Sequence, residues 1–150
     1  MPTLRDRLFQ FYWRRQRPLT LGVRGIVTDE EGRVLLLRHT YTPGWHFPGG
    51  GVEKNETAVT ALSRELKEEA QLTMSGTPEL ISVHSNHRVF PNDHVLVFRV
   101  GEWSAEAFIP NGEVKETRFV DPLDPPDETT GGTRRRLLEV FGAAPVSEHW

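Results

Sequence analysis

Helical hydrophobic periodicity is clearest over residues 56–70. Apolar side chains recur there at intervals of three and four residues, and this spacing places them on one stripe of an α-helix. The stripe consists of Val59, Leu62, Leu66 and Ala70. The pattern therefore predicts a helix with one face for a core. Ala58 and Ala61 are expected on the acidic side of the helix. Their small side chains leave space there for something bulky above the carboxylates.

Strands are predicted on both sides of this helix. Apolar or alternating runs bounded by turn residues predict strands at 19–28, 33–38, 79–85, 94–101 and 113–120. A closing helix is predicted at 133–141, and residues 104–112 and 121–132 are expected to be loops. This order of elements predicts an α+β layered domain.

Residues 3–16 combine apolar positions at helical spacing with four arginines, and the segment ends before Pro18. One interpretation is a basic amphipathic helix that lies on a membrane or guards a substrate entrance. The other is a helix or arm that docks on the domain, either within one chain or across a dimer. We favour docking, because the segment is short and its aromatic side chains pack on protein as readily as on lipid.

Three carboxylates share one arc of the 56–70 helix. Each residue advances about 100° around the axis, so Glu65, Glu68 and Glu69 converge. Like charges at these spacings destabilise a helix, and a bound divalent cation would remove the conflict. Three hard oxygen ligands without Cys suit Mg²⁺ or Mn²⁺ better than zinc. A solvated charged face is the alternative.

A glycine-rich turn, Gly49 to Gly51, precedes the acidic helix. Gly50 lies six residues before Glu56, and Glu56 lies eight residues before Arg64. The complete spacing is G-x5-E-x7-R-E-L-x-E-E, and it resembles the signature of the Nudix hydrolases. The resemblance covers about residues 19–141, with the motif at 49–72.

The resemblance implies a Nudix-like α/β/α sandwich with a mixed β-sheet between helices. It also implies Mg²⁺-dependent hydrolysis, with Mn²⁺ as a substitute, of the phosphoanhydride bond of a nucleoside diphosphate linked to another moiety. Candidate substrates are nucleoside diphosphate sugars, ADP-ribose, nucleoside triphosphates and dinucleoside polyphosphates. A Nudix-fold module that binds a nucleotide without cutting it is the alternative.

Carried over by position, the resemblance assigns roles to individual residues. The metal ligands are Glu65, Glu68 and Glu69, with the carbonyl of Gly49 or Gly50 as a neutral ligand. Arg64 would hold the carboxylates in place, and Glu56 would be an acid outside the ligand set. A late acid often completes metal binding or serves as general base in this family. The candidates here are Glu113 and Glu116, and we prefer Glu113.

Two positions depart from the family pattern. Gln71 stands where Gly is usual, so a left-handed helix end would cost up to roughly 1 kcal/mol more than with Gly. We therefore expect a longer or distorted helix end. Asn55 also replaces a common Gly, and it is expected to be harmless because Asn tolerates a positive φ and is a good N-cap.

Loop residues are candidates for substrate binding. Tyr41 and Trp45 can stack on a base or sugar, and plain packing of their loop is the alternative for both. Arg88 and Phe90 fall at the tip of the hairpin predicted over 79–101, where they can clamp a phosphate and a base. A solvated tip explains these two equally well.

Composition limits the class of protein. The 150 residues predict one domain at 19–142, with an N-terminal arm at 1–18 and a loose C-terminal tail at 143–150. The net charge of −3 argues against broad nucleic-acid binding, although it leaves room for local basic patches. The family resemblance implies a small nucleotide-type substrate as the partner. There is no Cys to form disulfides, and no apolar run is long enough to span a membrane. A cytoplasmic enzyme is the resulting expectation, with a homodimer favoured by the family resemblance.

Overall fold

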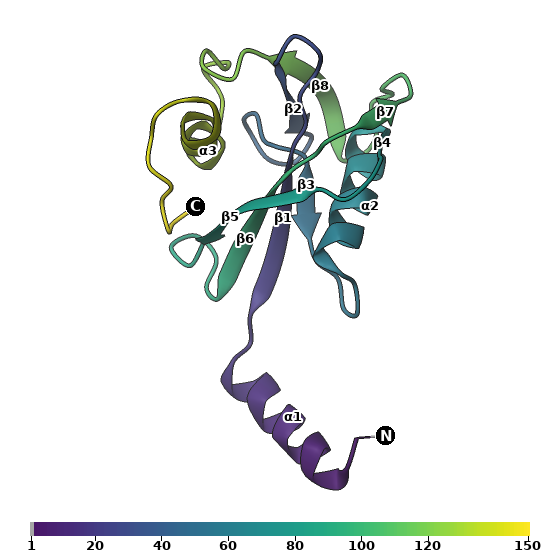
Figure 1. The fold of residues 1–150 in the computed structure, drawn as a ribbon, viewed down its shortest axis with the longest axis vertical. Helices are drawn as coiled ribbons and strands as arrows, with labels where there is room; N and C mark the ends of the chain where they lie inside the picture. The colour runs from purple at the N-terminus through teal and green to yellow at the C-terminus, as the bar shows by residue number, and fades with distance from the viewer. Residues whose placement is uncertain (1) are drawn as a thin grey trace.

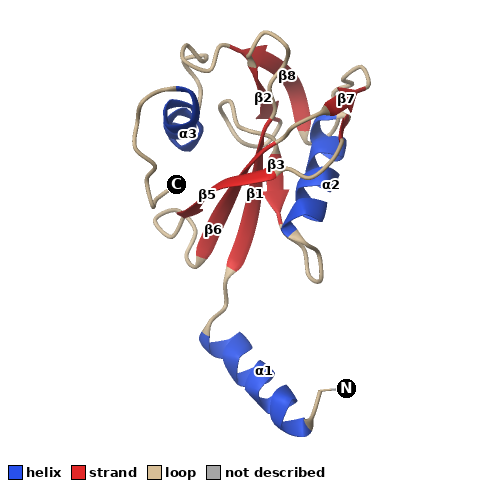
Figure 2. Cartoon of the chain, viewed as in Figure 1, coloured by secondary structure: helices blue, strands red, loops and turns tan. Residues whose placement is uncertain are grey.

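The computed structural model describes residues 2–150, which contain three helices and eight strands (Figures 1 and 2). In chain order they are α1 (Leu4–Gln16), β1 (Thr20–Ile26), β2 (Val34–His39), β3 (Gly49–Gly51), α2 (Ala58–Ala70), β4 (Leu72–Met74), β5 (Glu79–Ser85), β6 (Asp93–Arg99), β7 (Trp103–Ala105), β8 (Val114–Val120) and α3 (Gly131–Phe141).

The central sheet is mixed and has the strand order β3-β1-β6-β5. β1 runs parallel to β6, whereas β3 and β5 are antiparallel to their neighbours. β2 and β8 form a separate antiparallel pair, and β4 pairs with β7. The predicted mixed sheet is therefore confirmed.

Helices cover the two faces of this sheet, with a separate core under each helix. On one face, Leu62 and Leu66 of α2 join a buried cluster with Val23 and Phe98. On the other face, Leu137 of α3 joins the cluster of Ile26, Leu36 and Val97 (Figure 1). Gly25 of β1 lets α2 approach closely, since a Cβ there would lie 3.1 Å from Leu62. The predicted α/β/α sandwich is confirmed.

The predicted core stripe of α2 is correct except at one position. Leu62, Leu66 and Ala70 are buried, but Val59 in the first turn is exposed. Ala61 is fully buried against the sheet, and not on the acidic side as expected. The buried face of α2 is therefore rotated slightly from the predicted stripe. The small Ala61 side chain allows α2 to pack closely on the sheet.

The C-terminus of α2 differs from the expectation of a longer or distorted end. The helix ends at Ala70, and Gln71 itself adopts the left-handed conformation, with φ 50° and ψ 34°. Its backbone N–H still bonds the carbonyls of Leu66 and Lys67, and its side-chain oxygen accepts from the Ile109 N–H. Asn55 also has a positive φ of 64°, but the helix N-cap is Thr57. Both departures from the family pattern thus keep the backbone that Gly would adopt.

Three short elements were not predicted. The glycine triplet, expected as a turn, is the edge strand β3, paired with residues 22–24 of β1. Gly49 lies so close to Val23 that a Cβ would collide with the Val23 carbonyl. β4 and β7 are only three residues each, too short to give a periodic signal.

The C-terminal tail is docked, and the expectation of a loose tail was wrong. Its last residue, Trp150, packs against the core cluster on the α3 side, and its backbone N–H bonds the Ser85 carbonyl. Arg136 of α3 is fully buried, where it pairs with Glu139 and donates to the His149 carbonyl at 3.1 Å. Arg136 is therefore unavailable to an anionic substrate, whereas the neighbouring Leu138 is exposed.

α1 projects away from the rest of the chain (Figure 1). The predicted helix is present, but none of its residues is buried, so the expected docking on its own domain does not occur. Thr3 and Asp6 form a reciprocal capping box at its start. Within residues 2–150, no helix combines the length and apolarity needed to cross a membrane.

We predict that Gln71→Gly raises the free energy of unfolding by about 0.5–1 kcal/mol, because Gly adopts the left-handed backbone without strain. Urea unfolding of both proteins measures the change. Gln71→Ala is the matched control, since it removes the same side chain but keeps the strain. An equal effect of the two substitutions would contradict the explanation.

Candidate active site

The glycine strand and the acidic helix meet at the centre of the site. The Gly49 N–H donates to Oε2 of Glu69 at 2.8 Å, and the Glu69 side chain is almost fully buried. Gly50 lies directly against the Glu65 carboxylate, where any Cβ would collide with it. The two carboxylates are thus held against β3 because its residues have no side chains.

Arg64 joins the carboxylates of the motif to one another. Its Nε and Nη2 donate to the two oxygens of Glu56 at 2.9 and 3.1 Å, which is a bidentate ion pair. Its Nη1 donates to Glu65 at 2.9 Å and to Glu68 at 3.4 Å. Nη2 also reaches the Gly51 carbonyl at 3.1 Å. One guanidinium therefore fixes the loop after β3 against α2.

These contacts shift the pKa values of both partners. Hydrogen bonds from Arg64 lower the pKa of Glu56, with a further contribution from the Glu53 N–H at 2.9 Å. The same bond to Glu56 raises the pKa of Arg64. Glu56 is therefore ionised, and both of its oxygens accept hydrogen bonds from Arg64. This arrangement suits a role in holding Arg64 in position.

Glu65 carries unbalanced negative charge. Burial raises its pKa above the ordinary value, and the neighbouring charges of Glu69 and Glu68 raise it further, although Arg64 opposes them. A divalent cation at this point would favour the ionised form of all three groups. Hard carboxylate oxygens beside a glycine backbone fit Mg²⁺ or Mn²⁺ in ligand chemistry.

The three predicted ligands are not equivalent in the structure. Glu65 and Glu69 face β3, whereas the Glu68 side chain is 55% exposed and turned toward Arg64. Within residues 2–150, no three His, Asp or Glu side chains are grouped tightly enough to hold an ion as they stand. Glu68 has the freedom to rotate, since among residues 2–150 its carboxylate contacts only the Arg64 guanidinium, at 3.4 Å.

The two late acids differ in availability. Glu116 is paired with Arg118 at 2.7 Å and lies 4.0 Å from Arg38. Glu113 is exposed, and its charge acts on Tyr41 together with the charges of Glu69 and Glu65. Its loop contacts the acidic helix, since the Asn111 side chain donates to the Glu68 carbonyl at 3.3 Å. Glu113 is therefore the freer of the two candidates.

Sequence reasoning missed two histidines beside the acids. His39, at the end of β2, places Nε2 2.9 Å from Oε1 of Glu69. Its ring also lies 5.1 Å from the Tyr41 ring and 5.2 Å from the His46 ring. Burial lowers the pKa of His46. Tyr41 is 70% exposed, so the three rings form a wall beside Glu69 that is open on one side.

Arg24 of β1 was also missed. Its side chain is partly buried, and burial lowers its pKa, while the charges of Glu69, Glu65 and Asp93 act in the opposite direction. Its described hydrogen bond is from Nη1 to the Val23 carbonyl at 2.8 Å. An arginine inside an otherwise apolar strand is a signal that the sequence did contain, because Arg is rarely buried without a role or a partner.

The other predicted substrate residues lie elsewhere. Trp45 is 3% exposed within the α3-side core, with Arg38 and Arg118 stacked on its ring, so it cannot stack on a substrate. Arg88 and Phe90 are exposed at the tip between β5 and β6. No contact among the described residues joins this tip to the acids, and its His87 ring lies 5.3 Å from His149 of the tail.

Comparisons with known proteins agree with this geometry. The NUDIX domain model matches residues 18–141, which include the sheet, α2 and α3. The chain therefore belongs to the Nudix family. The crystal structure of a MutT NUDIX hydrolase from Burkholderia pseudomallei superposes with a TM-score of 0.70 at 24% identity, covering 81% of this chain and 97% of that one. At this identity the likeness shows the shared fold.

Relatives with assigned activities are similar over shorter stretches. An RNA pyrophosphohydrolase of Halorhodospira halophila is 53% identical over 47 residues, 31% of this chain and 26% of that protein. An 8-oxo-dGTP diphosphatase of Proteus vulgaris is 34% identical over 88 residues, 55% of this chain and 76% of that protein. The first three curated relatives are matched over only 26%, 43% and 30% of their lengths.

We predict that Gly50→Ala lowers turnover by about 10²-fold, because the added methyl group displaces the Glu65 carboxylate. Gly51→Ala is the matched control, since a Cβ there meets nothing within 4 Å. Steady-state kinetics and thermal unfolding of both variants measure the two effects. Similar turnover in the two variants would show that Glu65 does not depend on its place beside Gly50.

Proposed function

We propose that this protein hydrolyses a phosphoanhydride bond of a nucleoside diphosphate derivative. The observation that carries the proposal is the placement of Glu65 and Glu69 against Gly49 and Gly50, with Arg64 bridging the remaining acids. Carboxylates concentrated around one backbone segment repel one another and oppose folding. Such a destabilising arrangement is expected at a functional site, where the charges take part in catalysis.

The residues that would hold a divalent cation are Glu65, Glu68 and Glu69, with a carbonyl of Gly49 or Gly50. Bound Mg²⁺ or Mn²⁺ supplies neutralisation of the pyrophosphate charge and a lowered pKa for a coordinated water. Arg64 holds Glu56 and Glu65 in place, and the Gly49 N–H and His39 hold Glu69. In this proposal Glu113 would accept a proton from the attacking water, or add a ligand.

The substrate is anchored outside the acids by Arg24 and Tyr41. Arg24 has no ion-pair partner among the described residues, so its guanidinium can donate to a phosphate. The exposed Tyr41 ring can stack on a base or ribose. Arg88 and Phe90 lie in the turn between β5 and β6, at the sheet edge opposite β3, and would contact only an extended substrate.

The relatives act on different nucleotides. Their names specify an RNA pyrophosphohydrolase and an 8-oxo-dGTP diphosphatase, and the fold is shared with an ADP-ribose pyrophosphatase from Streptococcus suis at a TM-score of 0.64. A nucleotide with a phosphoanhydride bond is common to all three. We therefore propose a nucleotide with a phosphoanhydride bond as the substrate class, and leave the base and the second moiety to experiment.

A panel of nucleoside diphosphate sugars, ADP-ribose, nucleoside triphosphates, oxidised nucleotides and dinucleoside polyphosphates tests the proposal. We expect metal-dependent cleavage of at least one compound. Glu69→Gln should lower that rate by at least ~10²-fold, because a charge at the reacting centre is lost while the side-chain shape is kept. Unchanged turnover in Glu69→Gln at saturating Mg²⁺ would overturn the assignment of this residue.

A nucleotide-binding module without catalysis is the second candidate. It predicts a rise in thermal stability with nucleotide and Mg²⁺ but no cleavage of any compound in the panel. An interaction domain with a merely charged helix predicts neither. The thermal shift is measured on the same samples, so the three outcomes are separable.

We predict that Arg24→Gln raises KM by about 10-fold with a smaller change in kcat, because a charge-assisted bond to a distal phosphate acts on binding. Arg99→Gln is the control, since Arg99 is exposed and pairs with Glu79 at 3.1 Å on another strand. A fall in kcat with KM unchanged would place Arg24 at the reacting phosphate instead.

A further inference from the structure

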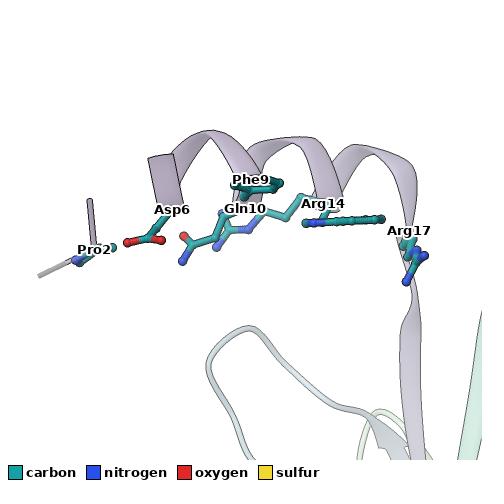
Figure 3. A pocket seen from close by; sticks show the side chains of 7 residues that line it. Pro2, Asp6, Phe9, Gln10, Arg14 and Arg17 are labelled. Carbon is teal, nitrogen blue, oxygen red and sulfur yellow. The ribbon is translucent and has the colours of Figure 1, made fainter. Parts of the chain in front are cut away.

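α1 carries a large apolar surface that nothing in the described chain covers. Its exposed side chains, each with 44–77% of its surface accessible, are Leu4, Leu8, Phe9, Phe11, Tyr12 and Trp13. The shallow hollow in Figure 3 is lined by seven side chains, and all of them come from residues 2–17. A helix of 13 residues is only marginally stable by itself, so an external surface must stabilise it.

Arginines are interleaved with these apolar side chains. At 100° per residue, Arg15 falls between Leu4 and Leu8, and Arg5 falls between Tyr12 and Phe9. A helix that lies in a membrane interface separates its apolar face from its basic face. This mixed face is suited to a protein surface that offers apolar contacts and acidic groups together.

The rest of the chain has the complementary charge. Residues 1–17 contain five Arg and one Asp, so their net charge is +4. The whole chain has a net charge of −3, which leaves −7 for residues 18–150. A second copy of the same chain is therefore an electrostatically favourable partner for α1.

The domain offers an uncovered apolar surface on the α2 side of its sheet. α2 packs mainly on β3 and β1, and Phe98 of β6 is buried beneath it. The edge strand β5 lies beyond β6 and keeps exposed side chains on this face. Leu80 and Val83 of the edge strand β5 are about half exposed there, and Leu21 of β1 is 41% exposed. These three share one face. Leu80 pairs with Phe98 and Val83 pairs with Leu96, and these two partners are two residues apart on β6. Leu96 also pairs with Val23 of β1, and Leu21 lies two residues before Val23. We call Leu21, Leu80 and Val83 the open sheet patch.

We propose that α1 of one protomer packs on the open sheet patch of a second copy, and reciprocally, in an arm-exchanged dimer. Only Arg17, Pro18 and Leu19 separate α1 from β1, and Pro18 keeps the preceding residue out of the helical conformation. The chain therefore leaves the domain as a short extended connection. Covering three of the four exposed aromatic rings of each arm buries roughly 1,200 Å² in total. This area is at the lower end of the standard interface size.

Sedimentation equilibrium of the full chain tests this proposal with two double variants. Phe11→Asp with Tyr12→Asp changes the arm, and Leu80→Glu with Val83→Glu changes the open sheet patch. Each is expected to weaken dimerisation by at least about 30-fold. Leu123→Asp is the control, because Leu123 is equally exposed but lies in the loop before α3. Thermal unfolding verifies that every variant is folded.

Mixing the two double variants provides a positive test. The arm variant keeps an intact patch and the patch variant keeps an intact arm, so the mixture should form a heterodimer that neither variant forms alone. A wild-type chain that stays monomeric at about 100 µM would overturn the proposal. So would a dimer that survives the arm substitutions, or a monomer that binds phosphatidylserine vesicles through Phe11 and Tyr12, which would assign α1 to a membrane.

Discussion

The contact between a side-chain-free strand and a row of carboxylates is the constraint on which the site depends. Gly49 has φ 147°, and a Cβ there would meet the Val23 carbonyl, so only glycine lets β3 pair with β1 at this point. Gly50 leaves room for Glu65, and the Gly49 N–H fixes Glu69. The same residues thus close the edge of the sheet and locate the acids.

Charge balance explains the residues around this contact. The site concentrates four motif glutamates, and Arg64 offsets part of their repulsion through four hydrogen bonds donated to Glu56, Glu65 and Glu68. His39 and Arg24 add positive or neutral donors from β2 and β1. The pKa of Glu65 is nevertheless raised, first by burial and then by the charges of Glu69 and Glu68. A residual negative charge of this kind costs stability, and it is retained where a cation and an anionic substrate are to be bound together.

The rest of the fold keeps the sheet rigid without entering the site. The buried Trp45 ring lies 5.6 Å from the Arg38 guanidinium and 4.8 Å from that of Arg118, and it anchors the loop that carries Tyr41. Arg136 and Glu139 form a buried ion pair whose remaining donors hold the C-terminal tail. A buried pair of this type is costly unless it is fully bonded, and here the tail supplies the missing acceptor.

The sequence by itself determined the helices, most strands and the acidic row, because these follow from local periodicity. Helix geometry places residues i, i+3 and i+4 together whatever the rest of the chain does, so the relation among Glu65, Glu68 and Glu69 was accessible. Only the tertiary structure decided that His39 reaches Glu69 and that Trp45 is buried, since both depend on segments brought together by sheet packing. The docked tail and the left-handed Gln71 have the same origin: contacts with Ser85 and Ile109, distant in sequence, compensate for local preferences.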